Sequence, residues 1–62
     1  MKKNEFMIFA KMIGEADALI SKEKNFNFND VYDFLKMHWG GTEEEFNSFA
    51  NEAISEYVKA FN

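Results

Sequence analysis

The chain has 62 residues, a net charge of −4 and no cysteine. A chain of this length forms at most one domain, residues 1–62, and buries only about 60% of the surface that it exposes when unfolded. The absence of cysteine excludes disulfides and zinc–thiolate sites, so stability must come from dense apolar packing or self-association. Packing is favoured by eight phenylalanines, two tyrosines and one tryptophan, because each aromatic side chain buries about 150–250 Å².

The charge is unevenly distributed, and its pattern argues against direct binding to nucleic acid. The first 24 residues carry five lysines and four acids, whereas residues 25–62 carry two lysines and seven acids. No basic cluster of the kind that neutralises phosphates is present, so a protein with a basic surface is the expected partner. No apolar run approaches the length of about 18 residues that spans a bilayer, and the first residues lack the pattern of a signal peptide. We therefore expect a cytoplasmic protein without a membrane partner.

The first predicted helix covers residues 4–21. Its apolar residues recur every three or four positions, the period of one helical face. The residues of this face are Phe6, Phe9, Ile13, Ala16 and Ile20. Three more apolar residues lie on its flank: Ile8, Met12 and Leu19. The combined apolar arc is about 160° wide, beyond the minimum of about 100° for a surface helix, so this helix is expected to contact two neighbours, or one neighbour and a partner.

The second predicted helix covers residues 28–39 and follows a polar connector over residues 21–25. Asn27 is placed to cap the helix, and Phe26 and Val31 are placed for a hydrophobic staple. The expected buried stripe consists of Phe28, Val31, Tyr32, Leu35 and Trp39, with Phe34 at its side. The alternation over residues 26–29 also fits a short strand, but no second strand is available to pair with it.

Residues 40–45 read Gly-Gly-Thr-Glu-Glu-Glu, a helix stop followed by a helix start. Glycine at a helix end is expected to adopt the left-handed conformation, and Thr42 and Glu45 have the spacing of a capping box. The third predicted helix covers residues 43–60. Its apolar stripe consists of Phe46, Phe49, Ala50, Ala53, Ile54, Tyr57 and Phe61. Three amphipathic helices with short connections predict an all-α, compact three-helix bundle.

The chain offers little for catalysis, so we expect no enzyme, no cofactor and no metal site. His38 is the one side chain whose unperturbed pKa lies near neutrality, and a role as general base or pH switch would pair it with the acids of residues 43–45. Its place at a helix end favours a structural role instead, next to the last carbonyls. The sequence contains no EF-hand loop and no glycine-rich phosphate loop. A DNA-reading helix–turn–helix is disfavoured because three carboxylates would begin its recognition helix.

Protein binding is the function that the sequence favours. The candidate partner-binding residues are Glu43, Glu44, Glu45, Asp30, Asp33 and Trp39. Carboxylates would steer the domain toward a basic surface of a host protein, and the aromatic side chain would supply affinity. The composition fits an accessory protein of a phage or mobile element that regulates or inhibits this host protein. One version of the hypothesis is mimicry of nucleic acid by the carboxylates.

The alternative is a homo-oligomeric structural or assembly protein. The feature that favours it is the wide apolar arc of the first helix, which one neighbour within the domain would not cover. The interface residues would then be Ile8, Met12 and Leu19.

Overall fold

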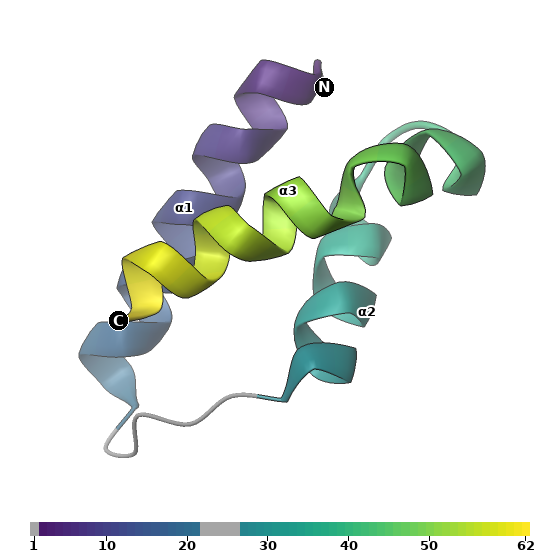
Figure 1. Ribbon diagram of the computed structural model, residues 1–62. Helices are drawn as coiled ribbons and strands as arrows, with labels where there is room; N and C mark the ends of the chain where they lie inside the picture. The colour runs from purple at the N-terminus through teal and green to yellow at the C-terminus, as the bar shows by residue number, and fades with distance from the viewer. Residues whose placement is uncertain (1, 22–26) are drawn as a thin grey trace.

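The computed structural model describes residues 2–21 and 27–62 (Figure 1). These ranges form three α-helices: α1 (Lys3–Ile20), α2 (Phe28–His38) and α3 (Glu43–Phe61). The predicted all-α, three-helix fold is therefore confirmed, and each predicted boundary lies within one residue of the observed one. Across the described ranges, no helix has the length and apolar character needed to cross a membrane.

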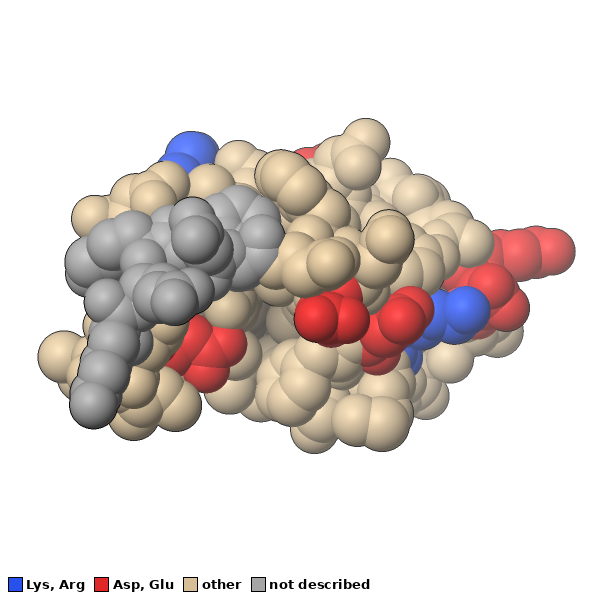
Figure 2. All heavy atoms as spheres, turned by 90° about the horizontal axis from the view of Figure 1, so that it is seen from below, with Lys and Arg blue, Asp and Glu red and all other residues tan. Residues whose placement is uncertain are grey.

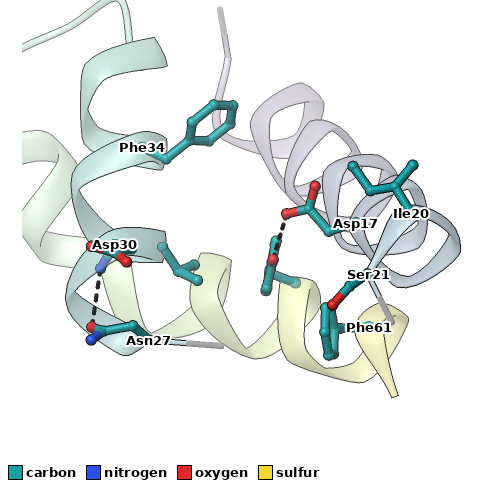
Figure 3. Close-up of a pocket in the computed structure, with 9 residues that line it drawn as sticks. Asp17, Ile20, Ser21, Asn27, Asp30, Phe34 and Phe61 are labelled. Atoms are coloured by element: carbon teal, nitrogen blue, oxygen red, sulfur yellow. Dashed lines mark hydrogen bonds between the residues drawn. The ribbon is translucent and has the colours of Figure 1, made fainter. Parts of the chain in front are cut away.

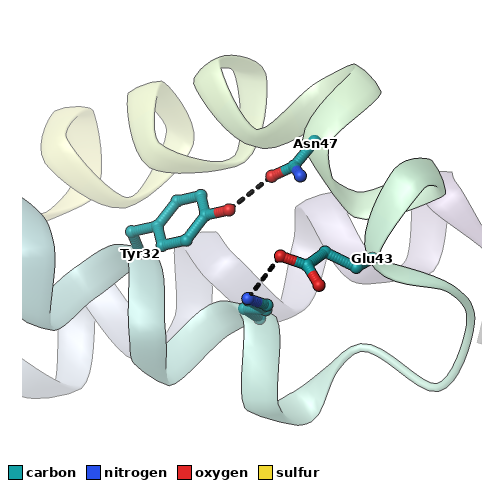
Figure 4. A network of polar contacts seen from close by, with 4 residues as sticks. Tyr32, Glu43 and Asn47 are labelled. Atoms are coloured by element: carbon teal, nitrogen blue, oxygen red, sulfur yellow. Dashed lines mark hydrogen bonds and ion pairs between the residues drawn. The ribbon is translucent and has the colours of Figure 1, made fainter.

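Helix α3 is the central element, because it packs along α1 and also contacts α2. An ion pair of 3.2 Å between Lys3 and Glu52 links α1 to α3. Between α2 and α3, the Tyr32 hydroxyl donates a hydrogen bond to the Asn47 amide oxygen (Figure 4). Nearby, the ammonium of Lys36 lies 2.7 Å from a carboxylate oxygen of Glu43. These two polar contacts, from Tyr32 and from Lys36 one turn later, hold α2 to the first turns of α3.

The core is one apolar cluster to which all three helices contribute. Its buried members are Phe6, Ala10, Val31, Leu35, Phe46, Phe49, Ala50, Ala53, Tyr57 and Phe61. Phe6 lies at its centre, with ring centroids 5.2 Å from Trp39, 6.1 Å from Phe46 and 5.9 Å from Phe49. The predicted stripe of α3 is confirmed, because all of its members are buried except Ile54, which is half-buried.

The buried face of α1 differs from the predicted one. Ala16 and Ile20, which were expected to face the core, are exposed, while Ala10 and Gly14 are buried. The reason is a close approach of two helices. A Cβ atom added at Gly14 would lie 2.3 Å from the backbone oxygen of Tyr57. Small residues allow α1 and α3 to pack at this short distance, and this requirement outweighs the pattern of large apolar side chains.

The start of α2 agrees with the predicted cap. The Asn27 side chain accepts hydrogen bonds from the backbone N–H groups of Asn29, at 2.8 Å, and of Asp30, at 3.4 Å. Phe28, which was expected in the buried stripe, is exposed although it shares a helical face with Val31 and Leu35. It occupies the first helical position, at the end of α2 away from the ring contacts of His38 and Trp39 with α1. The predicted staple involves Phe26, which lies outside the described residues.

The junction between α2 and α3 contains the predicted capping box, but its glycines act differently from expectation. The Glu45 amide donates to the Thr42 hydroxyl at 3.1 Å, and the Thr42 amide donates to the Glu45 carboxylate at 2.8 Å. The prediction of a left-handed glycine was wrong, since no glycine has a positive φ. Gly41 is required for space instead: a Cβ there would lie 2.6 Å from Trp39 Nε1 and 2.4 Å from the Glu45 carboxylate.

Candidate partner-binding groove

A groove of about 490 Å³ opens between the end of α1 and the start of α2, with α3 as its floor (Figure 3). At their other ends, α1 and α2 are held together by ring contacts of Phe6 with Trp39, at 5.2 Å, and of Phe9 with His38, at 5.6 Å. The described residues that line the groove are Asp17, Ile20, Ser21, Asn27, Asp30, Val31, Phe34, Tyr57 and Phe61. These ring contacts lie at one end of the helix pair, and the groove lies between the helices at the other end.

The groove combines apolar walls with carboxylates. Ile20 of α1 and Phe34 of α2 are both exposed and lie on opposite sides, while Val31 is buried at its base. Asp17 comes from α1 and Asp30 from α2, so each wall carries one carboxylate. No lysine is among the lining residues in the described part of the chain. Figure 2 shows the molecule from below, with separate acidic patches divided by uncharged surface and with a lysine beside the acidic group at one end.

Asp17 is a groove residue that the sequence analysis missed. Its carboxylate accepts a hydrogen bond of 2.5 Å from the Tyr57 hydroxyl, which fixes it at the α1–α3 contact. The sequence does indicate its position: Asp17 comes seven residues after Ala10 and three residues after Gly14, so the three lie on the same helical face. A carboxylate on a buried face is uncommon unless it has a partner. The prediction failed because the face was assigned from large apolar residues alone.

Burial raises the pKa of Tyr57 above its usual value of 10.0, and the hydrogen bond to Asp17 and the negative charge of that carboxylate raise it further. The folded state therefore retains this proton at a pH where the unfolded chain loses it. Stability from this contact is fully present below about pH 10 and is lost as the pH rises toward the folded-state pKa. Lys36, whose pKa is raised by its hydrogen bond to Glu43, acts in the same direction.

We expect the free energy of unfolding to fall as the pH rises above about 10, and to fall less steeply in Tyr57→Phe. The substitution keeps the ring in place and removes the ionisable hydroxyl, while the contribution of Lys36 is common to both proteins. Urea denaturation between about pH 9 and 11 measures both slopes. Equal slopes in the two proteins would show that the Tyr57–Asp17 contact does not hold the proton.

The structure does not gather the predicted acidic residues into one site. Asp30 lines the groove. Glu43 is paired with Lys36 (Figure 4), and Glu45 is part of the capping box, so both carboxylates serve the fold. Glu44 is exposed in the first turn of α3 and belongs to neither ion pair of the described residues.

Asp33 and Trp39 complete the predicted set. Trp39 lines a second pocket together with Glu45, and the charge of Asp33 acts on Lys36, the partner of Glu43. Asp33 is exposed on α2 and is not among the groove residues. Trp39 is half-buried, with its ring packed edge-on against Phe6 and, at 4.9 Å, against Phe49. Its indole nitrogen is buried without a hydrogen-bond acceptor among the described residues. Trp39 therefore packs against the core and does not stand out as a surface anchor.

His38 has the structural environment that its position indicated. Its Nδ1 donates a hydrogen bond of 2.9 Å to the Phe34 carbonyl oxygen, one turn earlier in α2. Its ring lies 4.3 Å from the Phe34 ring and 5.6 Å from the Phe9 ring. These contacts close the last turn of α2 and support the Phe34 wall of the groove.

A second surface feature is the apolar stripe of α1, which we define as Ile8, Met12 and Leu19. These side chains are 60%, 60% and 88% exposed, respectively. They lie on the side of α1 opposite the core, because Phe6, Ala10 and Gly14 are the buried residues of this helix. The stripe is also distinct from the groove, to which α1 contributes only Asp17 and Ile20.

A scan against protein-family models, a search of curated proteins and a search of solved structures each found no match to this chain. The function is therefore inferred from the groove and from the surface of the fold itself.

Proposed function

We propose that the protein is a protein-binding module whose groove receives a basic, amphipathic segment of a partner protein. The observation that carries this proposal is the pairing of apolar walls with a carboxylate on each side, Asp17 on α1 and Asp30 on α2. A lysine or arginine flanked by apolar side chains is the chemistry that complements such a lining.

The two kinds of lining residue have different roles in this proposal. Burial of the exposed Ile20 and Phe34 side chains supplies affinity, at about 25 cal/mol for each Å² of apolar surface removed from water. The carboxylates steer a basic segment toward the groove and set its orientation. The groove volume of about 490 Å³ lies in the usual range for binding pockets, about 300–1,000 Å³. It accommodates a few side chains of the partner, which fits a short segment.

The regulatory part of the proposal concerns the consequence of binding. In this proposal the acidic domain acts by occupying a surface of its partner. We place it in the cytoplasm, as an accessory protein of a phage or mobile element that inhibits or regulates a host protein with a basic surface. The composition supports this context, since the chain is rich in asparagine, lysine and phenylalanine.

Two matched charge reversals test which acidic surface binds. Asp30→Lys and Glu44→Lys both replace an exposed acid in the first turn of a helix, so their effects on helix stability are similar. Only Asp30 lines the groove. We expect Asp30→Lys to weaken partner capture at least about tenfold, since a cation would then face the basic segment across a short distance. Glu44→Lys is expected to change capture by less than about threefold.

The measurement is capture from a bacterial lysate with and without nuclease treatment, with the wild type and both variants as bait, followed by titration of the purified partner. Circular dichroism of each bait confirms that it is folded. Loss of capture with Glu44→Lys but not with Asp30→Lys would place binding at the acidic start of α3 and overturn the groove proposal. Capture that disappears with nuclease would reveal a nucleic-acid bridge and also contradict it.

A further inference from the structure

We infer that the apolar stripe of α1 is a self-association surface on which a second copy of the chain packs in the antiparallel direction. This inference does not depend on the proposed function, because the stripe and the groove share no residue. Exposure of three large apolar side chains on the outer face of one helix is costly in water unless a partner covers them. The charged residues on the same face of α1 indicate that this partner is a second copy of the chain.

The spacing along the outer face of α1 is that of a coiled-coil seam. The residues in line are Glu5, Ile8, Met12, Glu15 and Leu19. Successive members are three or four positions apart, as in the alternating a and d positions of a heptad. All five are exposed on α1. A second helix can therefore pack along this line without any change in the fold of the domain.

The two acids in the seam exclude the parallel orientation. In a parallel, in-register pair, each Glu15 would face Glu15 of the second copy, and each Glu5 would face its counterpart. Like charges opposed in a helical interface are destabilising. A parallel pair would thus bring four carboxylates into the contact with no cation in the seam.

The antiparallel orientation removes this repulsion and matches opposite charges. If Ile8 packs opposite Leu19 of the second copy, Met12 falls opposite Glu15. Lys11 precedes Met12 in the chain and lies at the edge of the seam. Its ammonium can therefore reach the Glu15 carboxylate of the second copy. Two-fold symmetry forms each of these contacts twice. The face is therefore complementary to itself in one direction only.

Lys11 and Glu15 are available for these contacts. The ion pairs among the described residues are Lys3 with Glu52 and Lys36 with Glu43. Lys11 and Glu15 take part in neither, and both are exposed. An intermolecular pair between them would therefore form without breaking an existing one.

Sedimentation equilibrium over a series of protein concentrations tests the association. The wild type is expected to form dimers. Leu19→Glu is expected to raise the dissociation constant of the dimer at least about 100-fold, because the substitution is present in both copies and removes two apolar contacts from the symmetric interface. Met37→Glu is the matched control, since Met37 is 72% exposed but belongs to α2. Its dissociation constant should stay within about threefold of the wild type. A wild-type protein that remains monomeric at the highest attainable concentration would overturn the inference, as would equal effects of the two substitutions.

Cysteine cross-linking tests the orientation, and the chain has no native cysteine to interfere. In the antiparallel register, residue 8 of one copy lies next to residue 19 of the other, whereas the two copies of residue 8 are about 16 Å apart. That distance is too long for a disulfide. We expect a mixture of Ile8→Cys and Leu19→Cys to form a mixed disulfide, while either variant alone forms none. Disulfides formed by Ile8→Cys alone would indicate a parallel pair and contradict the inference.

Discussion

Replacing Phe6 by alanine is expected to destabilise the fold by about 3–5 kcal/mol. Phe6 is fully buried, and its ring contacts those of Phe9, Trp39, Phe46 and Phe49. These residues come from α1, α3 and the end of α2, so the cavity would lie where all three helices meet. A 62-residue domain has a total stability of about 3–9 kcal/mol. The substitution should therefore unfold a large fraction of the molecules at room temperature.

Urea denaturation followed by circular dichroism measures this loss. Met37→Ala is the control, because Met37 is exposed and its truncation should change stability by no more than about 0.5 kcal/mol. A loss below about 1.5 kcal/mol for Phe6→Ala would mean that the aromatic cluster is not the centre of the core. Trp39 fluorescence gives a second measurement, since its ring lies 5.2 Å from the Phe6 ring.

Gly14→Ala is expected to destabilise the fold by up to about 2 kcal/mol, although alanine is the better helix former. A Cβ at this position would lie 2.3 Å from the Tyr57 backbone oxygen and 3.1 Å from the Ala60 Cβ. A backbone oxygen cannot rotate away as a side chain does, so α1 and α3 would have to separate. Overpacking of this kind costs about 1–3 kcal/mol or more. The gain of about 1 kcal/mol in helix propensity offsets only part of it.

Ala16→Gly is the control, because it makes the reverse exchange at an exposed position of α1. It measures the difference in helix propensity between alanine and glycine without a change in packing. It should lower stability by about 1 kcal/mol. Thermal denaturation of both variants gives the comparison. If Gly14→Ala proves more stable than the wild type, then α1 and α3 do not approach as closely at this point as the structure shows.

The starts of α2 and α3 could be predicted from the sequence because capping residues mark them. Asn27 caps α2 in the predicted way, and Thr42 and Glu45 form the predicted capping box at the start of α3. The stripe of α3 is also regular, so its buried face follows from periodicity alone. These features depend on neighbours within one or two helical turns, which is the range over which a sequence pattern is informative.

The groove could not be predicted, because it depends on how the helices are placed relative to one another. The close contact at Gly14 turns α1 so that Asp17 faces Tyr57 and Ile20 stays exposed. Neither the contact nor the resulting rotation is visible in the hydrophobic pattern, since glycine and alanine carry little weight in it. In contrast, the oligomer hypothesis predicts that the apolar stripe of α1 (Ile8, Met12 and Leu19) is not covered within the domain.

The same rotation also separates the two proposed surfaces. It directs Asp17 and Ile20 toward the groove and leaves the apolar stripe on the outer side of α1. A dimer formed through the stripe would therefore leave both grooves open to partner segments. Two linked grooves would bind a partner that presents two such segments more tightly than one groove could.

The measurement that tests the central claim most directly is methyl NMR of the labelled protein during titration with the captured partner. Binding in the groove predicts that the resonances of Ile20 and Val31 change, because both residues line it. The resonances of Ile8, on the apolar stripe of α1, should remain unchanged. Changes at Ile8 with none at Ile20 and Val31 would contradict the groove as the partner-binding site.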